Sequence, residues 1–147
     1  MVVNRERQVV YASRSLEELA AQEGETGEAL LGQRPGELLD CGHACETEAG
    51  CGGSESCRFC GAAQAIALTL ASGRPTSREC RLRVQRRTGE TVLNYAVTAA
   101  PFTLGSDEFV LLSFRDISRE KRKAALERIF FHDLLNTVSG LKVHLDL

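Results

Sequence analysis

The clearest pattern in the chain is SRECRLRVQRRTGETVLNYAVTAAPFTLGSDEFVLLSFRD, residues 77–116, which predicts most of a β-sheet. Cys80, Leu82 and Val84 alternate with polar side chains, and this period of two predicts a strand with one packed face and one solvated face. RTGE and LGSDE are typical turn sequences, so we expect three adjacent antiparallel strands. Pro101 interrupts the middle strand, which predicts an edge position or a bulge at that point.

The residues before this stretch predict two short strands and several helices. Residues 1–12 indicate two strands around a polar turn, because Val9, Val10 and Tyr11 favour extended structure. Helical segments follow after Ser13 and over AAQAIALTLASG, which ends at Gly73. The order of strands, helices and strands predicts an α+β domain with a five-stranded antiparallel sheet and its helices on one face.

Residues 118–147 differ from the rest of the chain and predict one long helix without proline. Its apolar residues recur at steps of four and three, and they are Leu126, Phe130, Leu134, Val138, Leu141 and Leu145. A lone helix cannot bury such a stripe against itself, so we expect it to pack on the domain or on a second copy. We interpret His144, at the edge of the stripe, as a packing residue. The sequence therefore divides into a domain, residues 1–117, and a helix, residues 118–147.

The composition narrows the class of protein. The chain has 147 residues, of which 43% are hydrophobic and 26% charged, values typical of one globular domain with an additional element. A net charge of −2 and few aromatic residues argue against nucleic-acid binding. No apolar run approaches the ~18 residues that span a bilayer, and the N-terminus does not resemble a signal peptide. We expect a cytoplasmic protein with neither a nucleic-acid nor a membrane partner.

Five of the six cysteines lie in CGHACETEAGCGGSESCRFCG, residues 41–61. Cytoplasmic thiols stay reduced, so clustered cysteines are more often metal ligands or redox groups than permanent disulfides. Three alternatives remain open: an iron–sulfur cluster, a structural Zn²⁺ and a thiol–disulfide switch. His43 is a weaker candidate ligand. Gly61 is expected to relieve the turn after the CRFC pair, and Cys80 is expected in the core.

Several motifs together resemble a PAS sensor domain joined to a sensor histidine kinase helix. VVNRERQVVYAS, residues 2–13, the helix that ends at Gly73 and a last strand that ends in RDIS are similar to PAS domains, with Ser118 at the Thr position of the Asp-Ile-Thr signature. FFHDLLNT, residues 130–137, resembles the phospho-acceptor box of two-component histidine kinases. The resemblance covers nearly the whole chain. It implies a PAS-like fold followed by a C-terminal signalling helix, through which two chains form a parallel homodimer.

The same resemblance implies roles in phosphotransfer. His132 would accept the phosphoryl group, Asp133 would hold or deprotonate its ring, and Asn136 would orient a water for dephosphorylation. Helical spacing predicts that His132 lies on the side of the helix opposite the apolar stripe. A response-regulator receiver domain would be the partner. No Gly-rich ATP-binding segment follows the box before Leu147, so we expect the chain alone to be inactive as a kinase.

The resemblance also selects a ligand set. Similar PAS sensors carry the pattern RPGE…C…GCG.SE.CR.CGA, which matches Cys41, Cys51, Cys57 and Cys60, with Cys45 as a further candidate. It implies a sensor of redox state, oxygen or a small ligand that signals to the histidine through a metal–thiolate domain. One rival is a small-ligand-binding PAS dimerisation module with a merely structural zinc site. A second rival is a purely structural dimerisation module.

Overall fold

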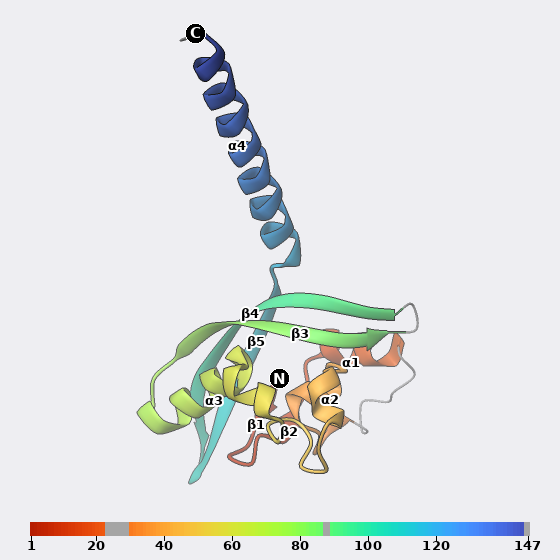
Figure 1. Cartoon of the computed structure of the whole chain (residues 1–147). Helices are drawn as coiled ribbons and strands as arrows, with labels where there is room; N and C mark the ends of the chain where they lie inside the picture. The colour runs from red at the N-terminus through yellow and green to blue at the C-terminus, as the bar shows by residue number, and fades with distance from the viewer. Residues whose placement is uncertain (23–29, 87–88, 146–147) are drawn as a thin grey trace. The chain divides into compact units, whose positions relative to one another are not determined.

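The computed structural model describes residues 1–22, 30–86 and 89–145, with side chains placed except at 19–22, 85–86 and 138–145. The chain divides into two compact units, Met1–Asp116 and Ile117–Leu147, and each is described by itself. The strands of the first unit form one antiparallel sheet in the order β2-β1-β5-β4-β3 (Figure 1). They are β1 (Val2–Val3), β2 (Val9–Tyr11), β3 (Thr76–Arg86), β4 (Gly89–Leu104) and β5 (Asp107–Asp116). The expected α+β class and five-stranded antiparallel sheet are confirmed.

The alternation of β3 is also confirmed. Cys80, Leu82 and Val84 are buried, whereas Arg81 and Arg83 are exposed. The predicted bulge at Pro101 is wrong, because β4 pairs with β5 in continuous register through this residue. The edge interpretation holds locally, since β3 pairs with β4 only as far as Ala99 and Pro101 lies beyond that pair. A residue without an N–H is tolerated there because that side of β4 has no pairing strand.

The helices of this unit are α1 (Arg14–Gln22), α2 (Pro35–Leu38) and α3 (Gly61–Ser72). Residues of α3 pack on β3 and β4, and Gly73 ends this helix in the left-handed conformation (φ 64°). The cysteine segment contains two 3₁₀ helices, η2 (Gly42–Cys45) and η3 (Glu55–Phe59). Short 3₁₀ turns are frequent as connectors between longer elements.

The core lies between the sheet and α3. Its buried members are Val3, Val9, Ala62, Ala65, Ile66, Cys80, Leu82, Val84, Val97, Ala99, Val110 and Leu112. Gly61 allows α3 to approach β3 closely, since a Cβ at this position would lie 1.9 Å from the carbonyl oxygen of Glu79. The role expected for Gly61, relief of a turn, is therefore corrected to close backbone packing. The start of α3 is fixed against the middle of β3.

The second unit consists of α4 (Ser118–Leu145). Leu126, Phe130 and Leu134 of the expected stripe are exposed by 67%, 61% and 44%. Ile129, Phe131 and Leu135 are exposed as well, so the apolar surface of the helix is wider than the stripe. The side chains of Val138, Leu141, His144 and Leu145 lie outside the described residues. Within the described part of the chain, no helix is both long enough and apolar enough to cross a membrane.

Candidate metal centre

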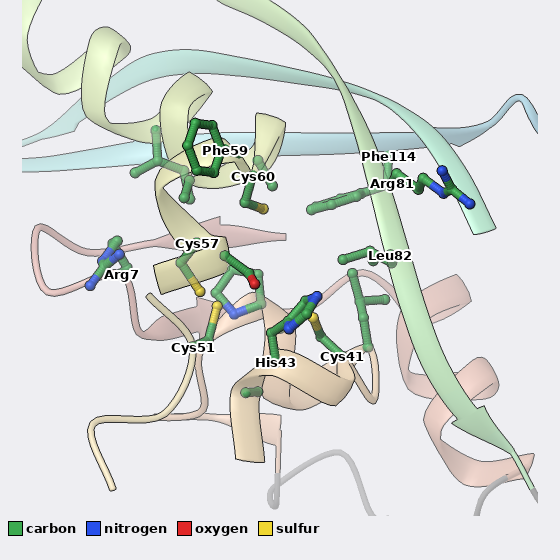
Figure 2. Close-up of a pocket in the computed structure, with 18 residues that line it drawn as sticks. Arg7, Cys41, His43, Cys51, Cys57, Phe59, Cys60, Arg81, Leu82 and Phe114 are labelled. Atoms are coloured by element: carbon green, nitrogen blue, oxygen red, sulfur yellow. The ribbon is translucent and has the colours of Figure 1, made fainter. Parts of the chain in front are cut away.

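A cavity of about 200 Å³ lies in the first unit between the cysteine segment, α3 and the sheet. Cys41, Cys51, Cys57 and Cys60 all line it, together with His43, Arg81 and apolar side chains of the core. Figure 2 shows the sulfurs of Cys51 and Cys57 turned toward each other and that of Cys60 pointing into the same space. Cys45 is exposed and does not line this cavity. The structure thus brings together the four thiols that the motif selects.

Each of the four cysteines is placed by backbone contacts. The N–H of Cys41 donates to the carbonyl of Gly36 in α2 (2.8 Å), and Cys41 also forms an isolated bridge with Val84 of β3. Cys57 lies in η3, and its carbonyl accepts from the N–H of Cys60 (3.2 Å). Cys60 is the N-cap of α3. Cys41 is therefore attached to α2 and β3, whereas Cys57 and Cys60 lie together at the start of α3.

The RPGE motif, residues 34–37, holds the loop that carries Cys51. One carboxylate oxygen of Glu37 accepts from the backbone N–H of Arg34 (2.8 Å), and the other accepts from the backbone N–H of Cys51 (3.2 Å). The guanidinium of Arg34 donates to the carbonyls of Ala49 (2.6 Å) and Cys51 (3.0 Å). Both sides of the Cys51 peptide are thus bound by one short helix and its N-cap.

Two glycines let the backbone come close to the sulfurs. A Cβ on Gly36 would lie 2.6 Å from Cys51 Sγ, so any larger residue would displace that thiol. Gly52 has a φ of 95°, a conformation that favours glycine, and its N–H donates to Cys57 Sγ at 3.3 Å. N–H groups directed at sulfur stabilise the thiolate form that binds metals.

Burial makes two of the thiols hard to ionise on their own. It raises the pKa of Cys51 to about 11, against a lowering by the backbone N–H of Gly36. It also raises the pKa of Cys41, against hydrogen bonds from the N–H groups of His43 and Ala44. Negative charge on Cys57 and Cys60 contributes to both increases, so the four sulfurs repel one another once ionised. A bound cation would relieve this repulsion.

Cys60 has a close neighbour outside the cavity, the thiol of Cys80. The two sulfurs are 3.6 Å apart, and the hydrogen bond from Cys80 lowers the pKa of Cys60 while raising that of Cys80. The N–H groups of Ala63 and Ala62 at the start of α3 lower the pKa of Cys60 further. Cys80 is buried as expected, but it also contacts the site, which sequence spacing did not indicate.

His43 is the weaker candidate ligand, and it also lines the cavity. Its Nδ1 lies 2.6 Å from a carboxylate oxygen of Glu46, whose second oxygen accepts from the hydroxyl of Ser54. The Ser54 hydrogen bond and then His43 lower the pKa of Glu46. This chain of contacts orients the imidazole and links η2 to the N-cap of η3.

The side chains are gathered, but they are not arranged as ligands around a point. Among the described residues, no group of three or more His, Cys, Asp or Glu side chains is placed to hold a metal ion as it stands. A cysteine has one side-chain torsion with three staggered positions, so a change of rotamer redirects each sulfur. The four thiols form a donor set around a cavity, and binding a group in that cavity requires such a change.

The candidate phospho-acceptor residues lie together on α4. The side chain of His132 is 73% exposed, and its Nδ1 lies 3.5 Å from Asp133 Oδ1. The amide nitrogen of Asn136 lies 3.2 Å from the same Nδ1. Helical steps of about 100° place Phe131 and Leu135 between the stripe and His132. The imidazole is therefore accessible but borders apolar side chains. The placement of His132 opposite the stripe did not take these side chains into account.

Comparison with protein-family models and with curated protein sequences finds no match to this chain.

Sequence reasoning missed four residues of the site: Arg34, Gly36, Glu37 and Cys80. The first three belong to the RPGE motif, which was used only to match the cysteine pattern of similar PAS sensors and not to predict contacts. A proline at the first helical position with an acidic residue two positions later is a typical helix start, and this signal was present. Nothing local indicated the contact of Cys80, because it depends on the packing of α3 against β3.

Proposed function

We propose that this chain is the sensory and phospho-acceptor part of a cytoplasmic two-component histidine kinase. In this proposal a PAS-like domain binds a metal group through Cys41, Cys51, Cys57 and Cys60 and signals to His132. The observation that carries it is the gathering of these four thiols around one cavity, while Cys45 stays outside it. Cys41 precedes η2, Cys51 lies between η2 and η3, and Cys57 and Cys60 lie in η3 and at the N-cap of α3. Their convergence therefore depends on how this segment folds.

The properties of the cavity favour an iron–sulfur cluster over a single zinc ion. A zinc ion sits about 2.3 Å from its four sulfurs and needs little space beyond them. The cavity of about 200 Å³ has room for a larger group, since one water occupies about 30 Å³ in the liquid. Backbone N–H groups face all four sulfurs, which is the arrangement that tunes clusters. When bound, the cluster would supply a reversible one-electron step or sensitivity to oxygen.

A route from the site to the helix is supported by connectivity. Cys41 bridges to β3, β3 pairs with β4, and β4 pairs with β5, whose last residue is Asp116. α4 begins two residues later, at Ser118. A change in the number or direction of the thiolate ligands would alter the packing of η2 and α3 on this sheet. Such signalling requires two packings that differ by only a few kcal/mol.

The phosphotransfer step would use the exposed imidazole of His132. Asp133 Oδ1 lies 3.5 Å from Nδ1. In the proposed step it would accept a hydrogen bond from Nδ1–H, which would leave Nε2 with its lone pair. Nε2 would attack the γ-phosphorus of ATP, the bond to the bridging oxygen would break, and ADP would leave. A kinase catalytic domain would present the ATP, and a receiver domain would take the phosphoryl group. Asn136, one turn along, would position water for hydrolysis.

One alternative is favoured by a specific observation. Leu39, Ile66 and Phe114 line the cavity, so it also suits a small apolar ligand. In that case the cysteines would only brace the loop with Zn²⁺, and the chain would be a ligand-binding dimerisation module. The two candidates differ in the metal they require.

Metal content after anaerobic purification tests the proposal. We expect stoichiometric iron and acid-labile sulfide in the full chain and in Cys45→Ser, and at least a tenfold loss in Cys57→Ser and in Cys60→Ser. Circular dichroism of each variant distinguishes loss of ligand from loss of fold. One zinc per chain without sulfide would support the ligand-binding module with a structural zinc. No metal in any preparation would contradict both that module and the cluster-binding sensor.

A further inference from the structure

Two cysteines that belong to different layers of the domain have their sulfurs in contact. Cys60 Sγ lies 3.6 Å from Cys80 Sγ. Cys60 lines the cavity, whereas Cys80 is 1% exposed in β3 and does not line it. A disulfide has an S–S distance of about 2.05 Å. The sulfurs therefore need only a small approach to form a bond.

The backbones already lie close enough for such a bond. A Cβ on Gly61, the residue after Cys60, would be 1.9 Å from the carbonyl of Glu79 and 3.2 Å from the nitrogen of Cys80. The segment that carries Cys60 thus rests directly on the part of β3 that carries Cys80. Rotation of the two side chains is the movement that would bring the sulfurs together.

We propose that Cys60 and Cys80 form an oxidisable pair, whose disulfide withdraws Cys60 from the four thiols of the cavity. Oxidation would leave Cys41, Cys51 and Cys57 as the remaining members of the set. The pair itself does not depend on a metal. Only its competition with metal binding rests on the proposed function.

The oxidant is a hydroperoxide that enters through the cavity. The Cys60 sulfur attacks a peroxide oxygen, the O–O bond breaks, and a sulfenic acid and one water form when the oxidant is hydrogen peroxide. The Cys80 sulfur then attacks the Cys60 sulfur, so that the S–S bond forms, the S–O bond breaks and the second water leaves. Two thiols are oxidised by two electrons, and one peroxide is reduced to two waters. Cys60 reacts first because it is the one that lines the cavity.

Peptide mass spectrometry tests the pair in the full chain. The protein is reduced, freed of metal with a chelator, treated with one equivalent of hydrogen peroxide, alkylated and digested. We expect a Cys60–Cys80 cross-link as the main product, unchanged in Cys45→Ser and absent in Cys80→Ala. Cross-links from Cys60 to Cys41, Cys51 or Cys57 instead, or a Cys80 that stays reduced in wild type, would overturn the proposal.

A second arm tests the competition with the zinc ion as the probe. Zinc-loaded full chain should form the cross-link at least tenfold more slowly than metal-free chain. Equal rates with stoichiometric zinc bound would overturn the competition. A chain that binds neither zinc nor iron would count against the proposed function, while the metal-free result would still decide the pair.

Discussion

One cavity is lined by Cys41, Cys51, Cys57 and Cys60, which come from different parts of the cysteine segment. By contrast, His132, Asp133 and Asn136 lie within little more than one turn of a single helix. The first group is half-buried and held by hydrogen bonds between residues well separated in the chain, such as the one that the N–H of Cys51 donates to the carboxylate of Glu37. The second group is exposed, and its contacts are between residues one and four positions apart. The arrangement of the thiols therefore depends on the packing of the domain, whereas the arrangement around His132 depends only on the geometry of α4.

The largest expected effect is on phosphotransfer. With ATP and a sensor-kinase catalytic domain supplied separately, His132→Gln should abolish labelling of the chain, because glutamine has no nucleophilic ring nitrogen. The variant should keep its full metal content, since α4 forms a unit of its own. His43→Gln is the matched control and should still be labelled. Label that persists in His132→Gln would show that another residue accepts the phosphoryl group.

The next effect is on the proposed homodimer. Phe130 is 61% exposed on α4, so a partner helix would bury a large apolar surface there. Phe130→Ala should raise the dimer dissociation constant roughly 100-fold or more, because the residue occurs twice in a symmetric interface. Arg128→Ala, an exposed position on the other side of the helix, is the control. Sedimentation equilibrium measures both, and equal constants would remove Phe130 from the interface.

A smaller effect is expected inside the thiol site. Gly36→Ala would place a methyl group 2.6 Å from Cys51 Sγ. We expect the free energy of unfolding to fall by about 1–3 kcal/mol, as in other overpacked sites, and metal affinity to fall with it. Gly42→Ala is the control, because its Cβ would meet the carbonyl of Arg83 at 3.4 Å, an ordinary contact. A Gly36→Ala chain as stable as wild type would indicate that the Cys51 loop moves freely.

The smallest effect is on pH dependence. Burial raises the pKa of Cys51 from 9.0 to about 11, so the unfolded chain ionises before the folded one. The stability linked to the neutral Cys51 thiol is therefore fully present below pH 9 and should be lost between pH 9 and pH 11. We expect metal-free protein to lose on the order of 1–2 kcal/mol over this window, allowing for partial exposure of the thiol. Denaturant titrations at each pH should show a smaller loss in Cys51→Ser.

The sequence was sufficient for the sheet because alternation is a local signal. Cys80, Leu82 and Val84 predicted the packed face of β3 directly, and Gly73 predicted the end of α3. For Pro101 the edge alternative was right and the bulge alternative was wrong. A proline is tolerated there because β3 stops pairing with β4 before this residue. The residues around the proline do not predict how long the neighbouring strand is.

The sequence predicted which cysteines line the site but not which contacts hold them there. Residue spacing and a motif selected the four thiols, yet they did not reveal the binding of the Cys51 loop by Arg34 and Glu37. The contact between Cys60 and Cys80 joins positions twenty residues apart, and it exists only because Gly61 lets α3 rest on β3. Such contacts follow from tertiary packing, which no window of sequence contains.

X-ray absorption spectroscopy of the bound metal shows whether Cys41, Cys51, Cys57 and Cys60 bind one metal group. We expect a coordination sphere made only of sulfur at about 2.3 Å, with short iron–iron distances if the group is a cluster. This shell should be unchanged in Cys45→Ser. A shell of nitrogen and oxygen, or a spectrum that changes only in Cys45→Ser, would contradict the account.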